Sequence, residues 1–181
     1  MKKIAIIVVA AVAIALLGLF GFASTRPDTY HVERSRTVAA SPADAYAMVS
    51  DFKRWDAWSP WSKLDPNQKV TQSGDAGTVG HSHAWVGNKD VGSGKMVITA
   101  VEAPSKVEIA LSFYEPFASE ARTKFVVETD GDKAKVTWAM DGDNNLLGKV
   151  MGLFMDMDTM IGKDFESGLA NLDGELAKAK N

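Results

Sequence analysis

Apolar residues recur every three or four positions from residue 146 to residue 176, which is the spacing of one face of an α-helix. The set comprises Leu146, Leu147, Val150, Leu153, Phe154, Met157, Met160, Ile161, Phe165, Leu169, Leu172 and Leu176. No proline interrupts this stretch, although several glycines lie in it and each weakens a helix by about 1 kcal/mol relative to alanine. A helix of about thirty residues is about 45 Å long. We therefore predict one long C-terminal helix, beginning near Asn145, that lies across a broad surface.

The middle of the chain alternates between apolar and polar residues, which is the pattern of half-buried β-strands. The alternation is clearest in residues 107–113, 121–127 and 136–140. An Asp-Gly pair at Asp130 and Gly131 predicts a hairpin turn before the last strand. Together with a first strand over residues 30–39, the pattern predicts about six to seven antiparallel strands.

Two short helices are expected after the first strand. Ser41, Pro42 and Asp44 form a helix start, with serine as N-cap, proline at the first helical position and an acid in the first turn. Trp55 and Trp58 are three residues apart and share one side of a further helical turn. The element order predicts an α+β domain in which helices cover one side of an antiparallel sheet.

The N-terminus is strongly apolar. Lys2 and Lys3 precede residues 4–23, which contain no charge. About 20 such residues can cross a bilayer as a helix, and the lysines favour a cytoplasmic N-terminus. We expect residues 1–23 to be a membrane anchor or signal sequence, residues 24–29 a linker, and residues 30–181 the folded domain.

Two locations follow from this N-terminus. A retained anchor places a single span, residues 4–23, in the inner membrane and the domain on the periplasmic or other extracytoplasmic side. Cleavage of a signal peptide near Ala23 would instead release the domain to the periplasm.

Composition removes several classes of function. The formal net charge is −3, and no basic cluster follows the N-terminus, so we expect no nucleic-acid partner. The chain has no cysteine, which excludes disulfides and thiol catalysis. No glycine-rich phosphate loop and no nucleophile-elbow motif is present, and we expect no cofactor. The oligomeric state stays open.

Two histidines lie close together in the middle of the chain. His81 and His83 lie two residues apart in a predicted strand and therefore point to the same side as Trp85. Such a pair can bind a metal ion, but the only other histidine is His31, in the first strand, and no acidic motif has ligand spacing. We expect no metal site. The pair either supplies hydrogen-bonding groups to a cavity or consists of ordinary packed histidines.

The element order and several local motifs resemble the helix-grip superfamily, often abbreviated SRPBCC. It includes START lipid-transfer domains, bacterial polyketide cyclase/dehydrase-like proteins and plant pathogenesis-related allergens. The motifs are WDAWSPW at 55–61, LDP at 64–66, WVGN at 85–88 with GSG at 92–94, and GKDFESGL at 162–169. The resemblance spans residues 30–178, and the chain looks in particular like the membrane-anchored bacterial polyketide-cyclase-like branch. The resemblance implies a curved sheet wrapped around the long C-terminal helix, with an apolar cavity between them.

The candidate cavity-lining residues are those on the inner sides of the strands and helix, together with two tryptophans that either pack in a small core or border the cavity mouth. They are Trp58, Trp61, His81, His83, Trp85, Ile109, Leu111, Phe113, Phe125, Trp138, Met140, Met151, Phe154 and Met155. Flexible methionine side chains are typical of adaptable apolar surfaces.

Three functions are compatible with this sequence. The first, which we favour, is a membrane-tethered module that binds a hydrophobic small molecule or lipid in the cavity. The second is a cyclase or dehydratase that acts on an apolar substrate through His81 or His83. The third is a protein-interaction or chaperone-like domain.

Overall fold

A seven-stranded antiparallel sheet forms the centre of the protein. The structure, a computed structural model, describes residues 2–179. The strands are β1 (Thr29–Val38), β2 (Lys69–Ser73), β3 (Ser82–Val86), β4 (Ser93–Glu102), β5 (Lys106–Glu115), β6 (Ser119–Asp130) and β7 (Lys133–Asp143). Their order across the sheet is β1-β7-β6-β5-β4-β3-β2. Only β1 is out of sequence order, because it pairs with β7 from Thr29 opposite Asp143 to Val38 opposite Ala134.

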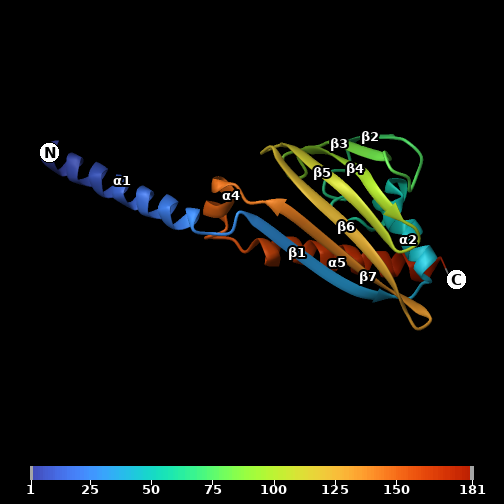
Figure 1. Ribbon diagram of the computed structural model, residues 1–181. Helices are drawn as coiled ribbons and strands as arrows, with labels where there is room; N and C mark the ends of the chain where they lie inside the picture. Colours follow the sequence, from blue (N-terminus) through green and yellow to red (C-terminus); the bar gives the residue numbers. More distant parts are fainter. Residues whose placement is uncertain (1, 180–181) are drawn as a thin grey trace.

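Helices cover one side of this sheet. They are α2 (Pro42–Ser50), the 3-10 turn η1 (Phe52–Arg54), α3 (Trp55–Trp58) and α5 (Met157–Lys178). The short helix α4 (Leu146–Met151) lies beyond the end of the sheet, against the N-terminal helix (Figure 1). In Figure 1, α5 runs along the sheet, whereas α1 (Lys2–Ser24) extends away from the domain. The predicted start of α2 is confirmed, because the Asp44 amide donates to Ser41 Oγ at 3.2 Å and Pro42 begins the helix.

The predicted α+β helix-grip architecture is confirmed, but the C-terminal helix is not continuous. It is interrupted between α4 and α5, over residues 152–156. Gly152 lies at the C-cap of α4, and Asp156 starts the second helix by accepting hydrogen bonds from the Asp158 amide and the Thr159 hydroxyl. The prediction of a single helix from Asn145 was wrong because apolar periodicity continues across a capped break.

Ion pairs fasten α5 to the edge strand β1. Arg34 Nε lies 2.8 Å from Glu166 Oε1, and Arg34 Nη2 lies 2.9 Å from Asp158 Oδ2. The guanidinium rests on Gly162, where any side chain would occupy the same space. Six residues further along α5, a Cβ at Gly168 would lie 2.8 Å from the Trp138 ring. The two glycines that weaken the helix locally thus permit its close approach to the sheet.

The hydrophobic core lies between the sheet and the C-terminal half of α5. Leu169, Leu172 and Leu176 are buried there, in the same cluster as Val49 of α2 and Val136 of β7. Because α5 and α2 fill this end of the domain, any space under the helix must lie toward its N-terminal half.

Candidate functional site

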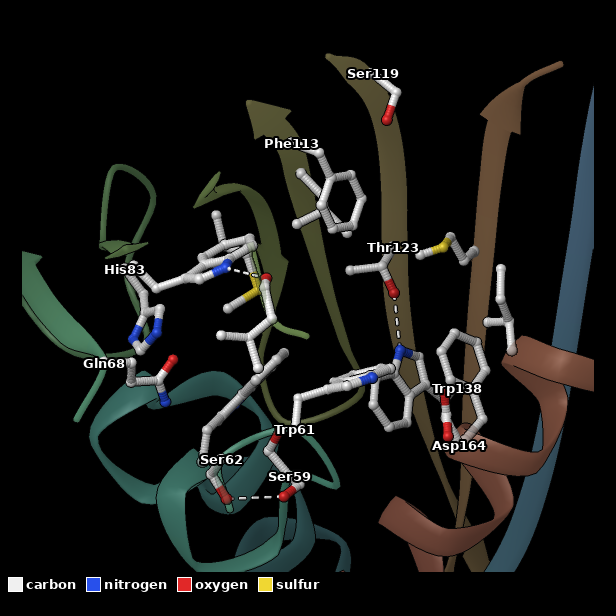
Figure 2. A pocket seen from close by; sticks show the side chains of 18 of the residues that line it. Ser59, Trp61, Ser62, Gln68, His83, Phe113, Ser119, Thr123, Trp138 and Asp164 are labelled. Atoms are coloured by element: carbon white, nitrogen blue, oxygen red, sulfur yellow. Dashed lines mark hydrogen bonds between the residues drawn. The ribbon is translucent and has the colours of Figure 1, made fainter. Parts of the chain in front are cut away.

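A partly enclosed cavity of about 400 Å³ lies between the sheet, the N-terminal half of α5 and the segment that follows α3. Figure 2 shows His83 and Gln68 on one side of this space, and Thr123, Trp138 and Asp164 on the other. The lining residues are Tyr30, Trp55, Asp56, Ser59, Trp61, Ser62, Gln68, His83, Trp85, Asp90, Val91, Met96, Leu111, Phe113, Ser119, Thr123, Trp138, Met140, Met157, Ile161, Asp164 and Phe165.

Two tryptophans of the wall have their polar atoms satisfied within the protein. Trp138 Nε1 donates to Thr123 Oγ1 at 2.9 Å, and the Thr123 hydroxyl donates to the Ala139 carbonyl at 2.8 Å. Trp85 Nε1 donates to the Val91 carbonyl at 3.1 Å. An indole whose N–H is already bonded offers only apolar ring surface to a ligand. These walls therefore favour an apolar occupant.

The wall is held rigid by stacked aromatic rings. Trp138 lies parallel to Phe165 of α5, with ring centroids 4.1 Å apart and planes at 8°. Trp61 meets Trp138 edge-on at 5.7 Å. The stack links β7, α5 and the segment after α3, so it sets the height of the helix above the sheet.

His83 is the polar group of the β3 wall. Its Nδ1 lies 3.1 Å from Gln72 Nε2, and as an acceptor from that amide it leaves the ring proton on Nε2. Burial lowers the pKa of His83 below its ordinary value of 6.5; nearby Asp56 opposes this shift, and His81 adds to it. The imidazole is therefore neutral at pH 7 and can donate one hydrogen bond to a bound molecule.

Replacing His83 with glutamine is expected to flatten the pH dependence of stability below pH 6.5. Because the folded pKa is lower than the unfolded one, stability is fully present above pH 6.5 and falls as the pH drops toward the folded pKa. One such proton contributes a slope of at most about 1.4 kcal/mol per pH unit. Urea unfolding of the detergent-solubilised chain at several pH values measures it. His31→Gln, at an exposed position, is the control; equal slopes in wild type and His83→Gln would contradict this assignment.

The charge of the lining is one-sided. Among the described residues that surround the space, the charged side chains are Asp56, Asp90 and Asp164, with neither lysine nor arginine. Burial, followed by Asp141 and Asp143, raises the pKa of Tyr30, so its hydroxyl keeps its proton. The cavity thus presents carboxylates and neutral hydrogen-bonding groups to a ligand.

Half of the sequence-predicted site residues meet at this cavity. Those that line it are Trp61, His83, Trp85, Leu111, Phe113, Trp138 and Met140. Three others are packed in the core: Trp58, Ile109 and Phe125. His81 is 1% exposed against the Phe52 ring, at 4.7 Å, and does not line the cavity. Met151, Phe154 and Met155 are exposed to solvent.

On the C-terminal helix, the residues that border the cavity differ from the predicted Met151, Phe154 and Met155. Met157, Ile161 and Phe165 of α5 line the cavity instead of residues 151–155. Their spacing of four residues, on the stripe that continues to Leu169, was the available signal. Within residues 2–179, no group of three or more metal-ligating His, Asp or Glu side chains occurs.

The sequence matches the family model described as "Polyketide cyclase / dehydrase and lipid transport" over residues 29–177. The chain belongs to this family. The match covers the entire sheet and almost all of α5, and it confirms the resemblance to the helix-grip superfamily. No curated protein is significantly similar to the chain in sequence.

Solved structures share the fold at low identity. A structural-genomics protein from Thermobifida fusca is 20% identical with a TM-score of 0.61, covering 82% of this chain and 93% of that one. Ginseng major latex-like protein 151 from Panax ginseng is 14% identical with a TM-score of 0.58, covering 82% and 98%. The Aha1 dimer from Colwellia psychrerythraea is 15% identical with a TM-score of 0.59, covering 81% and 96%. Family and fold together support a hydrophobic-ligand-binding or polyketide-cyclase-like domain.

Proposed function

We propose that the protein is a membrane-tethered binding module for a hydrophobic small molecule or lipid, held between the sheet and α5. The observation that supports this most strongly is the apolar cavity of about 400 Å³. Small-molecule sites typically have volumes of about 300–1,000 Å³, apolar walls and few polar groups. The space beside Trp138 and Ile161 fits that description.

The polar groups narrow the class of ligand. Asp56, Asp90 and Asp164 accept hydrogen bonds and repel anions, and His83 adds one neutral donor. Asp90 is paired with Lys89, but Asp56 and Asp164 have no cation beside them in the described lining, so a fatty-acid carboxylate would place a negative charge near two uncompensated carboxylates. We therefore propose a neutral or amine-bearing apolar molecule with a small polar end, such as a long-chain alcohol.

The tether is the N-terminal helix. α1 has 23 residues and is long and apolar enough to cross a membrane, a property that it shares with signal sequences near an N-terminus. The uncharged stretch exceeds the 7–15 apolar residues usual for a signal peptide, which favours a retained span. Lys2 and Lys3 would then lie in the cytoplasm and the domain on the other side.

A series of probes with equal chain length tests the proposal: dodecanol, dodecylamine and dodecanoate. Titration of the full chain in detergent, followed by its tryptophan fluorescence, gives the three dissociation constants. We expect the alcohol and the amine to bind, and dodecanoate to bind at least about tenfold more weakly, a difference of about 1.4 kcal/mol. Failure of all three to bind would refute the binding function. Preferential binding of dodecanoate would refute only the charge preference.

The second candidate is an enzyme of cyclase or dehydratase type, which the position of His83 in the cavity favours. A neutral imidazole can act as a general base. His83 is bonded to Gln72 rather than to an acid that would orient it, and His81 lies outside the cavity, so binding remains the better-supported function. If His83→Gln lost the formation of a product but bound the probes like the wild type, the protein would be an enzyme rather than a binding protein alone.

A further inference from the structure

The C-terminal end of α1 is packed against α4. Ala23 is buried at the end of α1, and α4 is the element that packs most extensively against this helix. At 1.5 Å per residue, about 20 uncharged residues span about 30 Å, the thickness of the hydrocarbon core. The apolar stretch ends at Ala23 and the first charge after it is Arg26, so a bilayer crossed by α1 would reach its interface at the level of α4.

The linker holds the domain close to this level. The Lys149 ammonium of α4 is buried and forms an ion pair with Asp28. The Asn144 amide donates to the Asp28 carbonyl at 2.7 Å, and Asn144 Nδ2 donates to the Pro27 carbonyl at 3.3 Å. These hydrogen bonds fix the linker and therefore hold the domain close to the end of α1 and to the membrane.

Apolar side chains project from α4 and the turn that follows it. We define the α4 surface as the exposed residues Leu146, Leu147, Met151, Phe154 and Met155. Phe154 is 75% exposed. A cluster of exposed apolar side chains of this kind marks a contact surface.

Two exposed aromatic side chains lie at the same end of the domain as the α4 surface. Tyr114 lies at the end of β5 and Phe117 lies in the β5–β6 connection, and both are exposed. Pairing of Ala121 with Gly142 places this connection at the end where β7 leads into α4. Figure 1 shows α1 and α4 at that end of the domain.

We propose that the α4 surface inserts into the interface of the bilayer that α1 spans, an inference that rests on the retained span of the proposed function. Met157 and Ile161 follow this surface directly in the chain and line the cavity. Insertion would therefore bring the cavity against the membrane, from which an apolar ligand enters.

The contact is hydrophobic rather than electrostatic. Acidic residues outnumber basic ones around the α4 surface. The acids are Asp141, Asp143, Asp156 and Asp158, the cations are Arg26 and Lys163, and the one lysine of α4, Lys149, is paired with Asp28. A surface with this charge has no affinity for anionic headgroups. Insertion should therefore be independent of anionic lipid and resistant to salt.

The absence of cysteine from the chain permits a site-specific test in the full-length protein. Phe154→Cys carries an environment-sensitive fluorophore, and Asp132→Cys, in the exposed β6–β7 turn at the far end of the sheet, is the matched control. Each labelled chain is reconstituted into phosphatidylcholine vesicles that contain a lipid with a spin-label quencher near the headgroup. We expect several-fold stronger quenching at 154 than at 132, unchanged by molar salt or added phosphatidylglycerol.

The inference, the tether and the binding function fail on different outcomes. Equal quenching at both sites, in a chain that floats with the vesicles and binds dodecanol, refutes insertion and leaves the binding function intact. Quenching that requires phosphatidylglycerol refutes a hydrophobic contact. Shielding of the label at 154 only at high protein density assigns the surface to a second copy of the chain. If the protein does not float with the vesicles, the tether is refuted and the insertion with it. If the protein does not bind the probes, the binding function is refuted.

Discussion

Replacing Trp138 with alanine is expected to lower the free energy of unfolding by about 3–5 kcal/mol, the range for truncating a buried aromatic side chain. The indole is 2% exposed, stacks on Phe165 at 4.1 Å and meets Trp58 edge-on at 5.6 Å. Domains are stable by only about 5–15 kcal/mol. The loss would thus be a large share of the total, and urea unfolding in detergent, followed by far-ultraviolet circular dichroism, measures it.

Trp138→Phe serves as the control for this prediction. Phenylalanine keeps a ring against Phe165 but cannot donate to Thr123 Oγ1, which Trp138 does at 2.9 Å. We expect a smaller loss of about 1–2 kcal/mol. If the alanine variant unfolded at the same urea concentration as the wild type, the stacking of Trp138 on Phe165 would not be what holds α5 to the sheet.

Much of the fold could be predicted from the sequence because an element that buries only one of its sides shows a regular spacing of apolar residues. Residues 107–113 alternate in the sequence, and Val107, Ile109 and Leu111 are buried in β5. The start of α2 was equally predictable, because Ser41 and Pro42 act locally. The break between α4 and α5 was not foreseen: Asp156 is a good N-cap, but nothing in the apolar spacing shows where one helix ends.

The site was less predictable because alternation shows which side of the sheet a residue faces, but not which part of the strand borders the cavity. Ile109 and Leu111 share the inner side of β5, yet only Leu111 lines the cavity. Phe125 faces the same way and is covered by the rings of Trp55 and Trp58. The positions of α3 and α5 on the sheet decide which part of the inner side is packed core and which part borders the cavity. These positions follow from tertiary packing.

Replacing Ile161 with tryptophan is expected to weaken dodecanol binding by at least about tenfold, or about 1.4 kcal/mol. Ile161 is half-buried on α5, borders the cavity and packs on the core. A tryptophan side chain would extend into the space that the ligand occupies. Because the substitution fills a void rather than creating one, the fold should be retained.

Ser167→Trp is the matched control, since Ser167 is an exposed residue of the same helix. It adds an indole to α5 without entering the cavity, so its dissociation constant for dodecanol should equal that of the wild type. Comparable weakening in both variants would mean that a change in α5, rather than occupation of the cavity, reduces binding.

Native mass spectrometry of the full chain, released from detergent after gentle purification from its membrane, tests the container role of the cavity most directly. The wild type and Ser167→Trp should each show the added mass of one apolar molecule, and Ile161→Trp should not. A wild-type spectrum without added mass, or one whose added mass persists in Ile161→Trp, would contradict a ligand held beneath α5.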